Sequence, residues 1–384
     1  MPTELIDVPL GDRKLVERFI RVPWHVNREH HPSAQWVPPL LMDRRDYLNP
    51  DKNPFFEHVK AAFWVARVDG RDVGRVAAVV DADYIKFHGT QTGYLGMFEC
   101  IDDHAVAQAL VDRASAWLRE QGMTAMIGPF ELSTNYISGV LVDAFDREPG
   151  INMPYNPPYY DRLLGACGMR KAKDLLHWEL DPQKPTPERV VRVAEKMATR
   201  SGVKLRKMSF ADWDAEVLRT LEIYNDAWEK NWGFVPIGKK EYLHIAKDLK
   251  MVLHPDFALL AEVNGEPAAF VLTIQNVNPV LKKLDGKLFP FGILRLLWDL
   301  KVRKKITGGR LILLGIKAKF RGQGIDSLMF LATHRAGAAQ GWTSGEIGWT
   351  LEDNVMINRP IENFGSKAAA HYRIYEQELG EAAR

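Results

Sequence analysis

A strand–turn–strand pattern occurs twice in the sequence. The first copy extends from Phe63 to Val80 around Asp69-Gly70, and the second from Phe257 to Gln275 around Asn264-Gly265. Dipeptides of this kind between apolar runs are strong hairpin signals. Each hairpin is followed by a third strand, a helix and a fourth strand, at 93–99, 105–120 and 126–130 in the first copy and at 311–316, 327–340 and 347–349 in the second. The repetition predicts two similar β-β-β-α-β units.

The two copies are separated by a proline-rich stretch. Residues 182–187 contain three prolines, which is typical of a boundary between domains. A chain of 384 residues also has the length of two or three domains of about 100–200 residues each. We therefore expect an α/β protein with two tandem domains, at 1–181 and 188–384, each with a mixed central sheet flanked by helices.

Composition and charge exclude several classes of protein. The formal net charge of +2 gives no indication of nucleic-acid binding. No window of eighteen apolar residues is present, and the first residues lack the pattern of a signal peptide. Cys100 and Cys167 lack metal-ligand spacing, and the adjacent His30 and His31 have no carboxylate or cysteine partner at such spacing, so no metal site is expected. These observations predict a cytoplasmic protein.

The second unit contains a glycine-punctuated turn between a buried strand and a helix. Ile316-Lys317-Ala318-Lys319-Phe320-Arg321-Gly322-Gln323-Gly324-Ile325-Asp326 joins the strand at 311–316 to the helix that follows. Backbone N–H groups and the positive end of a helix dipole make such a turn an anion site. The spacing is neither a Walker loop, which needs Gly-Lys-Ser/Thr, nor the three-glycine dinucleotide fingerprint.

This turn resembles the coenzyme A loop of the GNAT superfamily of acyl-CoA N-acyltransferases, Arg/Gln-x-x-Gly-x-Gly/Ala. Arg321, Gly324 and Asp326 occupy the three marked positions; Asp326 departs from the family, and we expect it to cap the helix with its carboxylate turned away from the phosphates. The resemblance implies an acyl-CoA co-substrate, acetyl-CoA or another, with these cofactor-binding residues: Ile316, Lys317, Arg321, Gly322, Gln323, Gly324, Ile325, Asp326 and Asn354.

The likeness covers nearly the whole chain, which resembles a group of tandem-GNAT bacterial proteins. Other segments that carry it are Gly128-Pro129-Phe130, Ser133-Thr134-Asn135 and Tyr155-Asn156-Pro157-Pro158-Tyr159-Tyr160. In the first unit, however, the turn Cys100–His104 has no glycine or arginine and places Asp102 and Asp103 at the helix entry. Because carboxylates occupy the N–H groups and repel a pyrophosphate, we expect one acyl-CoA per chain, in the second unit.

Direct acyl transfer in a ternary complex requires a base for the attacking amine and a donor for the thioester oxygen. Glu346 and Glu352 are the candidate bases, with solvated or capping carboxylates as the alternative, and both would share one face of an extended segment. The N–H groups at Ile316-Lys317 would polarise the thioester. In the family a Tyr usually serves as the general acid, and the resemblance places Ile361 at that position. Tyr372 on the terminal strand is therefore the candidate general acid.

One insertion distinguishes the second unit. Residues 281–305 carry eight basic and two acidic residues, with more apolar positions than one helix face requires. Such a segment could cover a long acyl chain, lie at an anionic membrane surface, or be buried against the other domain or a second subunit.

These patterns predict an acyl-CoA-dependent N-acyltransferase that acts on a small-molecule amine. The alternative is a non-catalytic protein that binds acyl-CoA or senses a membrane interface, since Asp326 and Ile361 depart from the family pattern. Neither the amine nor the length of the acyl chain follows from the sequence.

Overall fold

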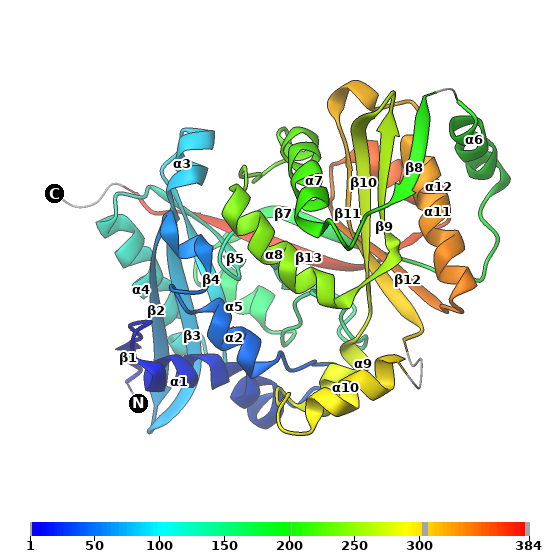
Figure 1. Ribbon diagram of the computed structural model, residues 1–384. Helices are drawn as coiled ribbons and strands as arrows, with labels where there is room; N and C mark the ends of the chain where they lie inside the picture. Colours follow the sequence, from blue (N-terminus) through cyan, green and yellow to red (C-terminus); the bar gives the residue numbers. More distant parts are fainter. Residues whose placement is uncertain (1, 201, 302–305, 381–384) are drawn as a thin grey trace. The chain divides into compact units, whose positions relative to one another are not determined.

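The structure, a computed structural model, describes residues 2–200, 202–301 and 306–380. The chain divides into two compact units (Figure 1). Unit 1 comprises the residues up to Leu175, Val280–Ile293 and the residues from Ala370, and unit 2 comprises Leu176–Pro279 and Leu294–Ala369.

Unit 1 is built on a mixed sheet that contains the first repeat. The strands follow the order β1 (Glu4–Asp7), β2 (Val59–Val68), β3 (Arg71–Asp81), β4 (Thr92–Cys100), β5 (Ala125–Phe130), β13 (Lys367–Glu378) and β7 (Arg170–Leu180), with β6 (Val140–Leu141) beside β13. Strands β1 to β4 are antiparallel, and β4 and β5 are parallel. The hairpin, the third strand and the fourth strand of the first predicted repeat are therefore all present in unit 1.

Helices cover the sheet of unit 1. The helical segments are α1 (Arg13–Trp24), a π-helix (His25–His30), α2 (Leu41–Tyr47), a 3-10 helix (Pro54–Glu57), α3 (Ala82–His88), α4 (His104–Glu120) and α5 (Tyr160–Ala166). The side chains of α4 and α5 form the main hydrophobic core with the sheet. Within residues 23–50, α1 continues through Trp24 and two further helical segments follow.

Unit 2 repeats this plan. Its strand order is β7, β12 (Ser344–Leu351), β11 (Gly308–Ile316), β10 (Glu266–Gln275), β9 (Leu253–Val263) and β8 (Val203–Lys207). Strands β8 to β11 are antiparallel and β11 and β12 are parallel, as in the first repeat. Helices α7 (Trp213–Trp228) and α8 (Lys239–Val252) lie on one face; α6 (Glu188–Ala198) and α11 (Ile325–Ala339) lie on the other, and α12 (Val355–Asn363) follows β12 (Figure 1).

The two units are not contiguous halves of the sequence. Strand β13, from the end of the chain, pairs with β5 in unit 1, and the second part of β7 is the neighbour of β12 in unit 2. Each sheet is thus completed by a strand that the sequence repeat would assign to the other half. The domain boundary predicted at 182–187 follows from the order of residues along the chain, which contains no information on such an exchange.

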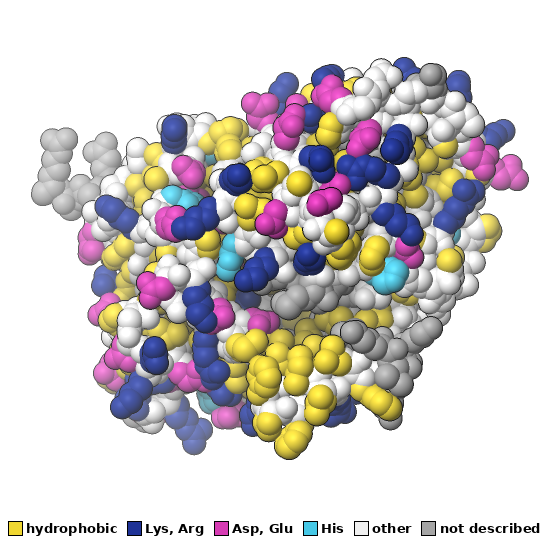
Figure 2. All heavy atoms as spheres, viewed as in Figure 1, with side chains coloured by type: hydrophobic (Ala, Val, Ile, Leu, Met, Phe, Trp, Pro, Cys, Tyr) yellow, Lys and Arg dark blue, Asp and Glu magenta, His cyan; other side chains and the backbone are white. Residues whose placement is uncertain are grey.

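The segment that was predicted as an insertion forms two short helices, α9 (Asn278–Leu284) and α10 (Gly292–Lys301). Residues 302–305, the end of the predicted insertion, lie outside the described residues. Hydrophobic side chains gather on the surface over α10 (Figure 2). None of the described helices is long and apolar enough to cross a membrane.

Candidate functional site

Strands β11 and β12 stop pairing halfway along their length. Their parallel register extends only from Gly308↔Ser344 to Leu311↔Ile347, although β11 continues to Ile316. On its other side, β11 pairs with β10 as far as Ile316↔Ala269. Ile312, Leu313 and Leu314 are only half-buried, although their strand lies inside the sheet. Because β12 no longer pairs with β11 beyond Leu311, this edge of β11 is able to bind an extended ligand.

The last backbone groups of β11 point to opposite sides. The N–H of Lys317 donates to the carbonyl oxygen of Ala268, at 3.0 Å, so it cannot polarise a thioester as the sequence predicted. Because successive N–H groups alternate along a strand, the N–H of Ile316 points to the side of β12. Ile316 therefore remains the candidate donor for a carbonyl oxygen at this position.

The expected coenzyme loop has the backbone of an anion site. Gly322 and Gly324 have φ of 70° and 89°, which favour glycine and turn the chain sharply into α11. A 3-10 helix, Ala318–Phe320, precedes them. The free N–H groups of the first turn of α11 follow directly, which is the arrangement that binds phosphate oxygens.

Arg321 holds this loop against the last turn of α7. Its Nη2 donates to the carbonyl oxygen of Ala227 at 2.7 Å, and its Nε donates to that of Ile316 at 3.2 Å. The N–H of Ala318 donates to Asp226 at 2.5 Å, close by on the same helix. A guanidinium has five N–H donors, so an exposed Arg321 can fix the loop and still contact a phosphate.

Asp326 does not cap helix α11. The N-cap is Gly324, and Asp326 lies in the first turn. A carboxylate there is stabilised by the helix dipole, as an N-cap would be, but it does not accept the capping hydrogen bond that the sequence predicted. Whether it faces a bound pyrophosphate stays a prediction.

Lys317 supplies a buried positive charge beside the loop. Its Nζ lies 2.5 Å from Glu222 and 3.3 Å from Glu266. Burial lowers the pKa of Lys317, but the hydrogen bonds and charges of Glu222 and Glu266 outweigh burial, and the pKa is raised overall. The ammonium group therefore stays charged at neutral pH.

The corresponding turn in unit 1 is filled by its own carboxylates. Asp103 caps α4 by accepting from the N–H groups of Ala105 and Val106, and Asp102 forms an ion pair with Arg162. These interactions use the helix entry that a pyrophosphate would need. This supports the prediction that the first unit does not bind acyl-CoA through this turn.

Two buried polar side chains, His177 and Arg310, and the partly buried Glu346 gather where β11 and β12 are still paired. Glu346 lies opposite Arg310 in the register, and its Oε2 is 3.8 Å from Nε2 of His177 on β7. Ile347, Leu311 and Trp178 belong to the hydrophobic core under α11, so strand alternation places their neighbours Glu346, Arg310 and His177 on the opposite face. Nε of Arg310 donates to the carbonyl oxygen of Gly348.

His177 and Arg310 were not among the residues predicted from the sequence. They lie on two strands far apart in the chain, and each stands alone in an apolar segment. A charged or imidazole side chain in the middle of a buried strand was the one available signal.

The other predicted residues differ in their surroundings. Glu352 is exposed and lies after the end of β12 at Leu351, so it does not share the environment of Glu346. Asn354 is the N-cap residue of α12, half-buried, beside the end of β12. Ile361 is fully buried in the core of unit 2, where it has a packing role.

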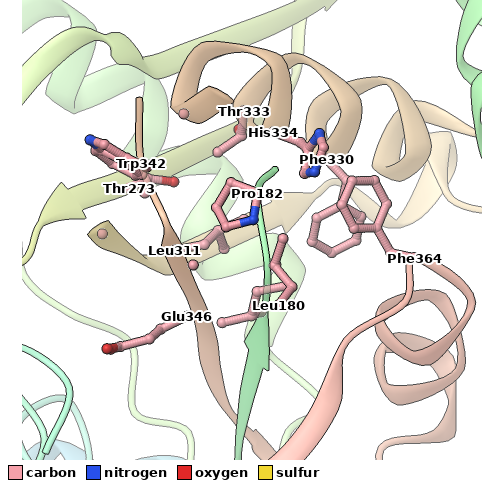
Figure 3. Close-up of a pocket in the computed structure, with 14 residues that line it drawn as sticks. Leu180, Pro182, Thr273, Leu311, Phe330, Thr333, His334, Trp342, Glu346 and Phe364 are labelled. Atoms are coloured by element: carbon pink, nitrogen blue, oxygen red, sulfur yellow. The ribbon is translucent and has the colours of Figure 1, made fainter. Parts of the chain in front are cut away.

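A small apolar pocket lies beneath α11 in unit 2 (Figure 3). Leu180, Leu311, Phe330, Trp342, Ile347 and Phe364 are among the residues that line it. The side chain of Glu346 extends away from the rings of Phe330 and Phe364. Burial lowers the pKa of His334 in the wall of the pocket, so this imidazole is neutral at pH 7. The lining favours a hydrocarbon group over a phosphate.

Tyr372, the candidate general acid, lies on the part of β13 that belongs to unit 1. It is buried and pairs with Leu141. The structure therefore does not place it within unit 2 beside the coenzyme loop. The neighbouring Tyr375 donates to Asp161 at 2.5 Å, and burial followed by this carboxylate raises its pKa far above the usual value.

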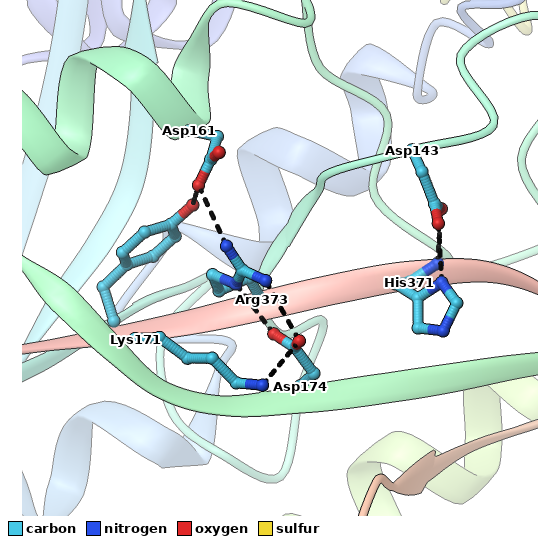
Figure 4. A network of polar contacts seen from close by, with 7 residues as sticks. Asp143, Asp161, Lys171, Asp174, His371 and Arg373 are labelled. Atoms are coloured by element: carbon cyan, nitrogen blue, oxygen red, sulfur yellow. Dashed lines mark hydrogen bonds and ion pairs between the residues drawn. The ribbon is translucent and has the colours of Figure 1, made fainter.

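Polar contacts hold β13 within unit 1 (Figure 4). Nε and Nη2 of Arg373 donate to the two carboxylate oxygens of Asp174 at 2.8 and 3.1 Å, and Lys171 lies 2.8 Å from the same carboxylate. On the same strand, Nδ1 of His371 lies 2.6 Å from Asp143. Burial raises the pKa of Asp174, but the hydrogen bonds of Arg373 and Lys171 outweigh burial and lower the pKa overall.

One group of potential metal ligands is present among the described residues. His58, Asp81 and Asp83 place ligand atoms within 4.8 Å of one another. Asp81 already accepts from the N–H groups of Asp83 and Tyr84 as the cap of α3, which explains the position of its carboxylate.

We predict that Arg321→Ala weakens coenzyme A binding by about 1–3 kcal/mol, because it removes a charge-assisted contact and the clamp on the loop. Isothermal titration with coenzyme A measures this change. Arg335→Ala is the matched control, since Arg335 is an exposed arginine on α11, the helix that follows the loop, with a long 3.5 Å contact to Glu195. Equal affinity of the two variants would remove Arg321 from the site.

We predict that Asp174→Asn destabilises the protein by about 2 kcal/mol at pH 7, because it breaks a bidentate pair with Arg373. A lowered carboxyl pKa stabilises the fold above the unfolded value of about 3.9, and this contribution is lost as pH falls through the folded pKa. Urea unfolding at pH 7 and pH 3 should thus show a smaller difference between the variant and the native protein at pH 3. The exposed Asp51→Asn provides the control; a constant difference would contradict the linkage.

Comparison with known proteins provides the family. No model of a known protein family matches the chain. It is 37% identical over 381 residues to the "Bacterial ceramide synthase" of Caulobacter vibrioides, covering 98% of both chains. It is 34% identical over 356 residues to "Protein YghO" of Escherichia coli, covering 90% of this chain and 89% of that one.

The fold has a counterpart among solved structures. A tandem GNAT protein from the clavulanic acid biosynthesis pathway superimposes with a TM-score of 0.61, covering 99% of this chain and 100% of that chain at 13% sequence identity. The predicted tandem GNAT-like fold class is confirmed. The repeated sheets, the loop before α11 and the two relatives lead to one conclusion: the chain is a GNAT-type N-acyltransferase, and it belongs to the family of the Caulobacter ceramide synthase and YghO.

Proposed function

We propose that this enzyme transfers a long acyl group from acyl-CoA to the amine of a long-chain amino alcohol of the sphingoid type. The observation that carries the proposal is the 37% identity, over 98% of both chains, to a protein named bacterial ceramide synthase. Ceramide is an amide of a sphingoid base and a fatty acid, so its synthesis is an N-acylation. The chemistry agrees with the GNAT fold, and acetyl transfer becomes the less favoured version of the predicted activity.

The acyl-CoA would bind along the free edge of β11. Its pyrophosphate would take the N–H groups of Gly322 to Asp326, and its pantetheine would continue the sheet beside β11, where pairing with β12 has ended after Leu311. The side chain of Asn354, at the end of β12, would be near the pantetheine. The N–H of Ile316 would then meet the thioester oxygen.

Transfer forms one C–N bond and breaks one C–S bond. The ammonium form loses one proton to give the neutral amine that attacks the thioester carbonyl, and Glu346 would receive this proton, directly or through water. His177, 3.8 Å away, would orient this carboxylate and share the proton. The nitrogen loses a second proton as the amide forms, and this proton would pass to the departing thiolate through water. The departing thiolate has a pKa near 8.5 and can leave without an acid, which accommodates a buried Ile361 at the usual Tyr position.

The proposal is tested with purified protein, palmitoyl-CoA and sphinganine, with acetyl-CoA and a short amino alcohol as comparison substrates. We expect release of free coenzyme A and an amide of the summed mass for the long-chain pair, at a rate at least tenfold above the comparison pairs. Thiol release and mass spectrometry measure both products. Turnover limited to short amines would overturn the proposed acceptor class and leave the N-acyltransferase chemistry in place.

Two glutamates provide a matched test of the base. Glu346→Gln should lower kcat by about a hundredfold or more, because general-base catalysis contributes this much. Glu352→Gln should change kcat by less than about threefold, since Glu352 is exposed beyond the end of β12. The reverse order would assign the base to Glu352. The residual activity of Glu346→Gln should also lose its acidic pH limb.

A further inference from the structure

The turn before α10 and one face of α10 expose an unusual number of large hydrophobic side chains. The exposed fractions are 64% for Phe289, 76% for Phe291, 63% for Leu294, 42% for Leu297 and 54% for Trp298. These are half of the large hydrophobic residues that are exposed in the described part of the chain. Leu294, Leu297 and Trp298 follow helical spacing, so they lie on one face of α10 (Figure 2). We call Lys287–Trp298 the apolar tip.

The base of this tip is fixed firmly in unit 1. Trp24 donates from Nε1 to Asp285 at 2.9 Å, and Arg28 pairs with the same carboxylate. The N–H of Leu41 donates to the carbonyl oxygen of Gly286. A Cβ on Gly286 would lie 2.7 Å from Trp24, so the chain packs closely there. The segment that leads into the turn before α10 is thus packed closely within unit 1.

The charges around the tip have one sign. Lys283, Lys287 and Arg295 are exposed. Of the two acidic residues of the segment, Asp285 is half-exposed and engaged by Trp24 and Arg28, and Asp299 is only 2% exposed. The sequence already shows an excess of basic residues in this segment, and its fully exposed charged residues among those described are cations. An apolar face with Trp, Phe and Leu and a cationic border is the composition of an interfacial membrane segment.

We propose that the apolar tip docks on the surface of an anionic lipid bilayer. Phe289, Phe291 and Trp298 would enter the boundary between head groups and acyl chains, while Lys283, Lys287 and Arg295 would pair with anionic head groups. This surface is distinct from the coenzyme loop and the polar side chains around Glu346. The inference does not depend on the proposed amine, because bilayer binding requires no turnover.

A second copy of the chain is a less suitable occupant. A symmetric contact would place the same patch on both partners, and therefore cations against cations. Such a pair is opposed by like-charge repulsion, whereas an anionic bilayer attracts the same residues. Charge complementarity thus selects the membrane.

Vesicle flotation tests the proposal. The full-length protein should float with vesicles of phosphatidylcholine and phosphatidylglycerol at 7:3, and at least tenfold less with pure phosphatidylcholine or in 0.5 M salt. The triple variant Phe291→Ser/Leu294→Ser/Trp298→Ser should lose at least tenfold in partitioning. Lys283→Gln/Lys287→Gln should lose the preference for anionic vesicles, because each cation near such a surface contributes about fivefold.

The control is Met42→Ser/Phe87→Ser, which removes exposed hydrophobic side chains elsewhere in unit 1. It should float like the native protein, and unchanged melting temperatures would show that all variants are folded. Equal flotation of the triple variant would overturn the proposal. So would a dimer in sedimentation that the triple variant abolishes, since that result assigns the tip to a second copy. Absence of the native protein from anionic vesicles would also overturn it.

Discussion

The candidate site depends on how the backbone groups of β11 are satisfied. Strand β10 pairs with one edge of β11 along its whole length, and beyond it the N–H of Lys317 donates to the carbonyl oxygen of Ala268. Strand β12 pairs with the other edge of β11 only as far as Leu311. Buried N–H and C=O groups require partners, so an edge that parts within a sheet needs a ligand or water. The side chain of Arg321 donates to the carbonyl oxygen of Ile316, whereas the N–H of Ile316 points to the side of β12. A carbonyl group bound there would be polarised by the backbone itself.

Electrostatics decides which of the two repeats can hold a coenzyme. Both contain a strand that leads into a helix through a short turn. In unit 2 the turn has two glycines with positive φ, Arg321, and the charged Lys317 beside it. In unit 1 Asp103 fills the helix entry. The same backbone plan therefore leaves the helix entry uncapped by a side chain in unit 2 and capped by a carboxylate in unit 1, and a carboxylate and a phosphate would compete for the same N–H groups.

The solubility of the proposed substrates agrees with the proposed binding of the apolar tip to a bilayer. A long-chain acyl thioester, a long-chain amine and their amide product all partition toward lipid. An enzyme that binds the bilayer surface would meet them at high local concentration. The polar residues Arg310 and His177, by contrast, are buried, and Glu346 is partly buried. Docking and chemistry would then use different residues, which can be altered separately.

Local patterns in the sequence were sufficient for the repeated elements. Apolar runs, Asp69-Gly70 and Asn264-Gly265 predicted the hairpins β2–β3 and β9–β10, and the helix predicted at 105–120 agrees with α4 within one residue. The glycines of the loop before α11 likewise predicted a turn, in which Gly322 and Gly324 have positive φ. These features arise from interactions between residues that are close in the chain, and a single sequence records them.

Tertiary structure alone decided the rest. The pairing of β13 with β5, the meeting of His177 with Glu346, and the engagement of the Lys317 N–H by Ala268 join segments that are far apart in the chain. No short pattern marks such pairs, because register and strand exchange are selected by the burial of whole sheets. The sequence by itself determined the two β-β-β-α-β repeats and the anion loop in the second. Which side chains surround that loop, and which charges at the apolar tip face solvent, followed from the packing of the folded chain.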